Sequence, residues 1–381
     1  MLNFQQPAAP SEALQNLRQE IREFLAHELR DRTPAQLAAS WSGRDPAFSR
    51  KLGERGWIGM TWPKRYGGSE RSALERYVVL EELLAAGAPV GHHWTADRQS
   101  GPLLLRHGTE AQKAELLPRM AAGELSFCIG MSEPGAGSDL AAISMSAVPV
   151  DGGFTVSGTK LWTTGAHAAD YMILFCRTGE RSEDRHAGAS QFLVRLDLPG
   201  ITVKPVYDLA GQHHFNEVNF DEVFLAADTV IGVLGEGWRQ VGGELAYERS
   251  GPERFLSTFT LLAEMVRRLA ENPPAGAEQV IGRLCARVAL LRRLSRSVAA
   301  ALQDGEVAPI QAAIVKDLGA NLEQEIVEIA RTLLPFAPDP QSSDPLIALY
   351  AHTMLRMPIF SIRGGTREIL RGIIARGLGV R

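Results

Sequence analysis

The chain has 381 residues, of which 45% are hydrophobic and 22% charged, and its formal net charge at pH 7 is -4. This length suffices for two or three packed domains, and the composition excludes a disordered or fibrous protein. The near balance of charges also excludes a general electrostatic attraction to nucleic acid or to an anionic membrane.

The cysteines and the N-terminal residues indicate the compartment. Cys128, Cys176 and Cys285 are widely separated and show neither a disulfide framework nor the spacing of a zinc site. Residues 1–29 lack the apolar core of a signal peptide and any apolar run of membrane length. We therefore expect a cytoplasmic protein that is neither exported nor anchored in a membrane.

Residues 1–123 predict a helical domain. Apolar residues recur at helical spacing in the first segment, at Leu14, Leu17, Ile21, Phe24 and Leu25. Helix starts are marked by cap residues with a proline or a carboxyl or amide side chain at the expected distance: Ser11, Asp45 before Pro46, Ser72 with Glu75, and Thr109 with Gln112.

Residues 124–234 predict a β domain and residues 235–381 a second helical region. Short β-branched and aromatic runs, separated by Gly, Asp and Pro, occupy 154–156, 171–176, 191–196, 201–206 and 217–220. Helical periodicity then predicts helices over about 238–270, 277–303 and 307–334 and a last one after Gly364-Gly365. Pro252 should bend the first of these helices. The fold class is α+β, in the order helices, strands, helices.

Two segments of the β domain carry the strongest signal for chemistry. They read Gly-Met-Ser-Glu-Pro-Gly-Ala-Gly-Ser-Asp over 130–139 and Gly-Thr-Lys-Leu-Trp-Thr-Thr over 158–164. Glycines let backbone N–H groups approach a ligand, hydroxyl groups bind its oxygens, and Trp162 offers a flat face to a ring. Either segment alone is most simply a turn with a core tryptophan; together they suit a large aromatic, phosphorylated cofactor.

In this arrangement the two segments resemble the acyl-CoA dehydrogenase family. The resemblance runs nearly end to end, through Trp62-Pro63, Tyr66-Gly67-Gly68, His107-Gly108-Thr109, and Gly365-Thr366 with Arg371, Ile373 and Ile374. It implies a barrel-like or sandwich-like β domain and a C-terminal four-helix bundle. It also implies bound FAD, α,β-desaturation of an acyl-CoA thioester, and electron transfer to an electron-transfer flavoprotein or a similar acceptor.

The resemblance also implies roles for individual residues. Trp162 and Thr164 would contact the isoalloxazine near N5, Ser138 would lie near both the pyrophosphate and the CoA chain, and Arg249 would lie near the substrate. The complete set of implied cofactor contacts is Ile129, Met131, Ser132, Ser138, Trp162, Thr163, Thr164 and Thr366. Ile129 and Thr163 differ from the residues most common in the family.

The general base is expected to be Glu248. In many family members a glutamate directly precedes the final Gly-Thr, where this chain has Gly364; other members carry the base on the first helix after the β domain, where this chain has Glu248. Helical spacing would place Val241, Leu245, Glu248, Phe255 and Phe259 on one face, and apolar surroundings favour the neutral form of a carboxyl group. The alternative is a solvated charged turn. Glu244 is expected to be an ordinary surface charge.

Two family segments that donate cofactor contacts across a subunit interface are missing. Pro273-Pro274 stands where an Arg and Phe-Gly segment is expected, and 333–338 lacks the Gly-Gly-x-Gly loop. We therefore expect a hetero-oligomer with a paralogous subunit. A homotetramer in which Arg292, Arg293 and Arg296 replace the missing contacts is the alternative, although a solvated helix face is the simpler assignment for these arginines.

Other functions remain open. A related flavin oxidase or monooxygenase, such as an acyl-CoA oxidase or nitroalkane oxidase, could use the same scaffold, and the chain could be a non-catalytic subunit that completes another chain's flavin site. The closest resemblance is to dehydrogenases of bulky CoA thioesters such as sterol-derived ones. The pairs His92-His93 and His213-His214 lack partners at ligand spacing, so we expect loop or core histidines and no metal.

Overall fold

The computed structural model describes residues 4, 11–179, 183–306 and 308–380, except for the side chains of 243–248. The chain forms two compact units. One comprises Met1–Arg44, Arg71–Gly91 and Ala246–Arg381 and is called here the helical unit; the other comprises Asp45–Glu70 and His92–Leu245 and is called the sheet unit. In the part of the chain described, no helix combines the length and apolar composition that a membrane span requires.

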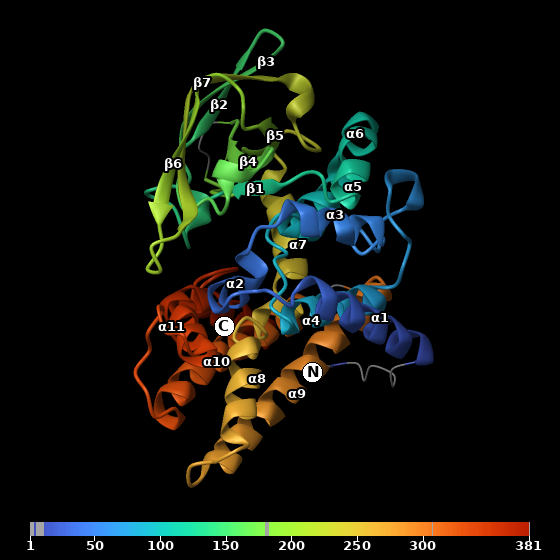
Figure 1. Ribbon diagram of the computed structural model, residues 1–381. Helices are drawn as coiled ribbons and strands as arrows, with labels where there is room; N and C mark the ends of the chain where they lie inside the picture. The colour runs from blue at the N-terminus through green and yellow to red at the C-terminus, as the bar shows by residue number, and fades with distance from the viewer. Residues whose placement is uncertain (1–3, 5–10, 180–182, 307, 381) are drawn as a thin grey trace. The chain divides into compact units, whose positions relative to one another are not determined.

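The helical unit brings together helices from both ends of the chain (Figure 1). They are α1 Glu12–Glu28, α2 Pro34–Ala39, α4 Ala73–Ala85, α8 Phe259–Leu269, α9 Ala277–Gln303, α10 Pro309–Leu333, α11 Pro345–Arg356 and α12 Arg367–Gly377. The helix starts predicted from the sequence are confirmed in this unit: Ser11 caps α1, and Ser72 with Glu75 forms a complete capping box at α4. Leu17, Ile21, Phe24 and Leu25 form the buried face of α1.

An ionic network joins α1, α4 and α9 inside the helical unit. Glu81 and Glu82 of α4 are 4% and 6% exposed, and they accept hydrogen bonds from Arg18 and Arg22 of α1 and from Arg292 of α9. Burial by itself would raise the pKa of Glu81, but the hydrogen bonds and charges of Arg292 and Arg18 outweigh it and lower the pKa. Arg292 therefore pairs with a buried acid while its own side chain stays 45% exposed, so it lies on a solvated helix face as expected and also has a structural partner.

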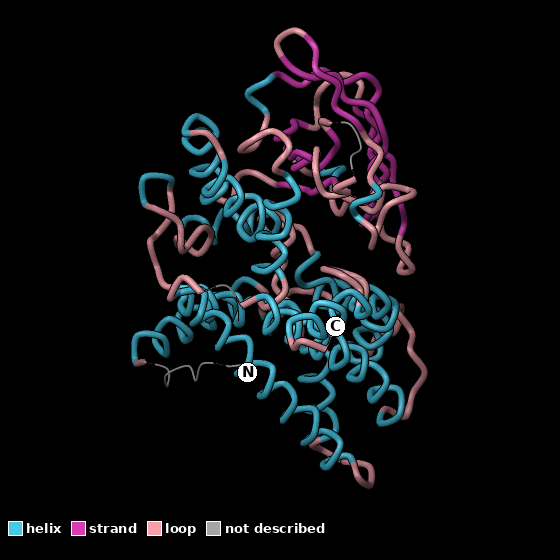
Figure 2. The backbone as a smooth tube through the Cα atoms, turned by 180° about the vertical axis from the view of Figure 1, so that it is seen from behind, coloured by secondary structure: helices cyan, strands magenta, loops and turns pink. Residues whose placement is uncertain are grey.

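Over its described residues, the sheet unit contains seven strands, which Figure 2 shows in magenta, and three complete α-helices. The strands are β1 Phe127–Gly130, β2 Ser146–Val150, β3 Gly153–Lys160, β4 Tyr171–Arg177, β5 Ala189–Arg195, β6 Ile201–Tyr207 and β7 His213–Ala226. The helices are α3 Pro46–Glu54, α5 Gly101–His107 and α6 Glu110–Ala121. The strand order is β1-β4-β2-β3-β7-β6, with β5 also paired to β4.

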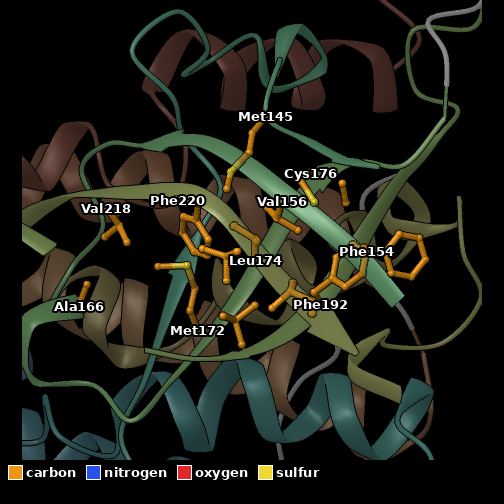
Figure 3. Packing of buried hydrophobic residues seen from close by; sticks show 14 of the residues in the cluster. Met145, Phe154, Val156, Ala166, Met172, Leu174, Cys176, Phe192, Val218 and Phe220 are labelled. Carbon is orange, nitrogen blue, oxygen red and sulfur yellow. The ribbon is translucent and has the colours of Figure 1, made fainter. Parts of the chain in front are cut away.

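Strand β4 is the centre of the sheet unit because both of its faces are buried. Met172, Leu174 and Cys176 point into one hydrophobic cluster, whereas Ile173 and Phe175 belong to two others. Figure 3 shows side chains from β3, β4, β5 and β7 converging in the first cluster. Five consecutive apolar residues are the pattern expected of a strand that is covered on both sides.

The predicted order of helices, strands and helices is confirmed, and two details need correction. The helix expected over 238–270 is broken: α7, Gly237–Glu248, ends well before α8, and a short 3-10 turn at Pro252–Arg254 lies between them. Pro252 has no N–H for a helical hydrogen bond, and here it starts a new turn. Helix α11 was not predicted, although Asp344 followed by Pro345 marks its start. The domain boundaries at 123/124 and 234/235 stay a prediction.

Candidate active site

The segment after β1 is a loop whose glycines leave space beside the backbone. A tight turn forms where Glu133 N–H donates to Ala136 O at 2.8 Å and Ala136 N–H donates back to Glu133 O at 3.1 Å. A Cβ atom placed on Gly135 or Gly137 would meet nothing within 4 Å, and neither glycine has a positive φ. The backbone at both glycines is therefore open, and a ligand could approach its N–H groups without meeting a side chain of this loop. Such a loop would have room for FAD, and its cofactor contacts stay a prediction.

Trp162 lies in a strained backbone conformation directly after β3. Its φ is +63°, which is unusual for a bulky residue, and it is 56% exposed. The Trp162 and Phe215 rings form an edge-to-face contact at a centroid distance of 5.9 Å, and more than half of Trp162 is still exposed. Thr164 is also exposed, whereas Thr163 is buried. Because exposed and buried side chains alternate over residues 162–164, Trp162 and Thr164 lie where a flat ligand can reach them.

Asn216 of β7 anchors this segment from within the sheet. Its carbonyl accepts from Thr163 N–H at 3.0 Å, and its side-chain amide donates to Thr163 O at 2.8 Å. Its Oδ1 lies 2.7 Å from His213 Nε2 and 3.2 Å from His167 Nδ1, and the two imidazole rings stack at 3.8 Å. His213 therefore belongs to a polar network behind the tryptophan. The sequence offered no signal for Asn216.

The remaining predicted cofactor residues of the sheet unit lie on β1 and the loop after it. Ile129 and Met131 are partly buried and pack against hydrophobic clusters, the backbone carbonyl of Ser132 accepts from Leu161 N–H at 2.9 Å, and Ser138 is exposed. Hydrogen bonding therefore joins the loop after β1 to the segment after β3. Met131, Ser132, Trp162 and Thr164 come together within one unit, and their cofactor roles stay predictions.

The helical unit holds Arg249, Gly364 and Thr366. Arg249 is 9% exposed, and its Nε donates to Gly364 O at 3.2 Å. Gly364 and Gly365 have φ values of +68° and +99°, and Thr366 follows as the N-cap of α12, where its hydroxyl accepts from Ile369 N–H. Arg249 thus supports the turn that precedes Thr366.

A buried arginine lies against the place where many family members carry their base. A Cβ atom on Gly364 would be 2.9 Å from both terminal nitrogens of Arg254, which is 2% exposed. Nothing in the sequence singled out Arg254, because arginine in a helical region is usually a surface residue.

Glu248 is the last residue of α7, and its side chain, like that of Glu244, lies outside the described residues. The prediction that Val241, Leu245, Glu248, Phe255 and Phe259 share one helix face is wrong for the last two residues. Because α7 ends at Glu248, Phe255 and Phe259 do not continue its helical face. Of the described apolar residues predicted for that face, Val241 and Phe255 are buried, at 3% and 1% exposure, and Phe259 is partly buried.

The two histidine pairs were expected to be loop or core residues. Among the described residues no group of three or more His, Cys, Asp or Glu side chains is arranged to hold a metal ion. His93 Nδ1 lies 2.9 Å from the Ser49 hydroxyl, and both residues are buried.

Comparison with known proteins identifies the family. Models of the acyl-CoA dehydrogenase N-terminal, middle and C-terminal domains match residues 11–124, 128–223 and 235–379. The chain is 32% identical to acyl-CoA dehydrogenase IpdE1 of Mycobacterium tuberculosis, over 96% of this chain and 98% of that protein. It is also 32% identical to acyl-CoA dehydrogenase FadE26 of the same organism, over 86% of each chain.

Two solved structures are similar over nearly the whole chain. The Tcur3481-Tcur3483 steroid ACAD has a TM-score of 0.86 at 27% identity and covers 99% of both chains. The ChsE4-ChsE5 complex from Mycobacterium tuberculosis has a TM-score of 0.84 at 28% identity and covers 98% of this chain and 99% of that one. With three domain models matched in order, the chain belongs to the acyl-CoA dehydrogenase family of FAD-dependent oxidoreductases that act on CH–CH groups.

Proposed function

We propose that this chain desaturates an acyl-CoA thioester between its α and β carbons, with Glu248 as the general base. The observation that carries the proposal is the structure around Gly364. Gly364 has a positive φ, which favours glycine, and the Arg254 guanidinium occupies the space beside it, so this chain supplies no carboxylate from the position that is common in the family. Glu248 is the acid at the other position that family members use.

In the proposed reaction, each of these residues has a separate role. Bound FAD supplies an acceptor for the hydride that leaves the β carbon. Glu248 takes the α proton, and the exposed Trp162 side chain and the hydroxyl of Thr164 orient the ring system. The open backbone at Gly135 and Gly137 receives the phosphates through N–H groups, and Arg249 holds the turn before Thr366.

The proposed substrate class is a CoA thioester with a bulky, ring-bearing acyl group. Gly364 adds no side chain at the position where many family members carry their base, and the similar Tcur3481-Tcur3483 protein is described as a steroid ACAD. The electron acceptor is proposed to be an electron-transfer flavoprotein or a similar carrier.

We expect a steroid side-chain CoA thioester to bleach the flavin anaerobically and a straight medium-length acyl-CoA to do so with a lower kcat/KM. Stopped-flow absorbance measures the bleaching, and an oxygen electrode measures turnover in air. Rapid oxygen consumption would assign the chain to the oxidase relatives. A higher kcat/KM for the straight chain would overturn the bulky substrate class.

We also propose a hetero-oligomer with a paralogous subunit. The chain lacks the two segments that contact FAD across an interface in related enzymes, and the described loop between α8 and α9 runs through Pro273-Pro274. The similar ChsE4-ChsE5 structure is a complex of two differently named chains. A partner that retains both segments would complete the flavin site that Glu248 serves.

Co-expression with a paralogous chain is expected to give one FAD per unlike pair, whereas this chain alone should purify with little flavin. Native mass spectrometry and flavin absorbance give the stoichiometry directly. A homo-oligomer with one tightly bound FAD per chain and full turnover would contradict this prediction. If Glu248→Gln left the activity of the assembled complex unchanged, this chain would be the non-catalytic subunit.

A further inference from the structure

Glu133 and Lys160 form a buried ion pair that the proposed chemistry does not use. Lys160 Nζ lies 2.8 Å from Glu133 Oε1, and the two side chains are 0% and 4% exposed. Buried charges of this kind are rare, and each is costly to remove from water. The position of the pair in the fold therefore needs an explanation.

Glu133 fixes the far end of the loop that follows β1. Its Oε2 accepts from Ser144 N–H at 2.7 Å and from the Ser144 hydroxyl at 2.9 Å, and its Oε1 accepts from Met145 N–H at 3.1 Å. Burial alone would raise the pKa of Glu133, but the charge and hydrogen bonds of Lys160 and Ser144 outweigh it and lower the pKa. The carboxylate is therefore ionised at neutral pH.

Lys160 fixes the near end of the same loop. Its Nζ also donates to Met131 O at 3.0 Å, so one ammonium group binds the loop at both Met131 and Glu133. Lys160 is the last residue of β3 and stands two residues before Trp162. Its pairing with Val218 of β7 holds the lysine backbone in the sheet. The pair therefore connects the loop after β1 to the segment after β3.

A purely stabilising role explains this arrangement poorly. Replacing a buried ion pair by apolar residues of similar volume is often neutral or stabilising, so stability alone does not require the charges. A buried pair does impose one geometry, because each charge must meet its partner at hydrogen-bond distance. The two segments that it joins, Met131–Ser132 and Trp162–Thr164, are the ones assigned to the flavin.

We propose that the Glu133–Lys160 pair is a positioning device that keeps Met131–Ser132 and Trp162–Thr164 at a fixed distance and orientation relative to each other. The surface that binds the flavin is then already formed before the cofactor arrives. Neither side chain needs to touch the cofactor. The pair acts through backbone groups: Met131 O on one side and the N–H groups of Ser144 and Met145 on the other. This inference rests on the proposed function, because it takes the two segments as the flavin contacts.

The test separates positioning from stability by comparing single and double variants. Lys160→Met and Glu133→Gln each leave one buried polar group without its partner, whereas the double variant Glu133→Gln/Lys160→Met removes both charges. The matched control is Lys204→Met, because Lys204 pairs with Glu217 at 3.3 Å on the same sheet but both are solvent-exposed. All variants are made in the assembled enzyme. The readouts are the melting temperature of the apoprotein, the FAD Kd from titration of apoprotein, and the visible circular dichroism of bound FAD.

We expect the single variants to lower the melting temperature and the double variant to recover most of that loss. The FAD Kd should nevertheless stay about 10 to 100-fold higher than that of the unmodified enzyme in all three, as for other groups that orient a ligand-binding side chain, and the dichroism of bound FAD should change. Lys204→Met should match the unmodified enzyme in every readout.

A double variant that binds FAD with the unmodified Kd and dichroism would overturn the positioning role. If the double variant does not fold, Glu133→Asp decides, because it keeps the charge but shortens the link: an unmodified FAD Kd in that variant also overturns the proposal. These outcomes differ from failure of the proposed function. If the unmodified assembled enzyme binds FAD but no acyl-CoA reduces it, the proposed function fails. The effect of the Glu133–Lys160 pair on FAD binding can still be measured in that case.

Discussion

Glu248→Gln is expected to leave FAD bound and to lower the rate of flavin reduction by acyl-CoA about 10³-fold or more. The amide keeps the size of the side chain but cannot accept the α proton. No second acid is available from the turn before Thr366, because Gly364 stands there and Arg254 lies against it. Single-turnover stopped-flow measurement under anaerobic conditions reports the reduction step directly.

Glu244→Gln is the matched control for this experiment. Glu244 lies one helical turn earlier in α7 and has no proposed role, so its amide variant should reduce the flavin at the unmodified rate. A Glu248→Gln enzyme that is reduced as fast as the unmodified one would exclude Glu248 as the base. Loss of FAD absorbance in Glu248→Gln would show that the substitution damages the site, and proton transfer would then not explain the loss of activity.

Arg363→Leu is expected to lower the free energy of unfolding by about 3–5 kcal/mol, because it leaves Glu323 charged and buried without its partner. The Arg363 guanidinium places its Nη2 atom 2.9 Å from both Glu323 oxygens, 2.7 Å from the Ser257 hydroxyl and 2.6 Å from Glu253 O, so the two hydrogens of that nitrogen are shared among these acceptors. It also lies over the Trp41 and Phe360 rings. Urea unfolding at neutral pH, followed by circular dichroism, measures the effect.

Two further variants make this prediction specific. Arg331 pairs with Glu328 on the surface of α10, so Arg331→Leu should change the free energy of unfolding by about 0.5 kcal/mol or less. The double variant Arg363→Leu/Glu323→Leu removes both buried charges and should recover most of the stability. Equal effects of Arg363→Leu and Arg331→Leu would contradict the importance of the buried pair.

Local signals in the sequence were sufficient for the helix ends and for the general order of the chain. Ser72 with Glu75 and Thr109 with Gln112 form capping boxes, because a cap involves residues only three positions apart. The same kind of signal, Asp344 before Pro345, marks α11. The residue at which the helix before Pro252 ends could be determined only from the structure. A proline can bend a helix or end it, depending on what packs against it.

Residue identity and short spacing were sufficient to identify the family, to predict the two segments assigned to the flavin and to show that Gly364 carries no carboxylate. Which charged residues are buried became visible only in the folded chain. Lys160 with Glu133 and Arg363 with Glu323 are 27 and 40 residues apart, and each resembles an ordinary surface charge until folding brings it to its partner. Asn216 likewise meets Thr163 only through the sheet, 53 residues away. A buried charge or amide is tolerated only where its partner is supplied, and that partner is a property of packing between distant segments.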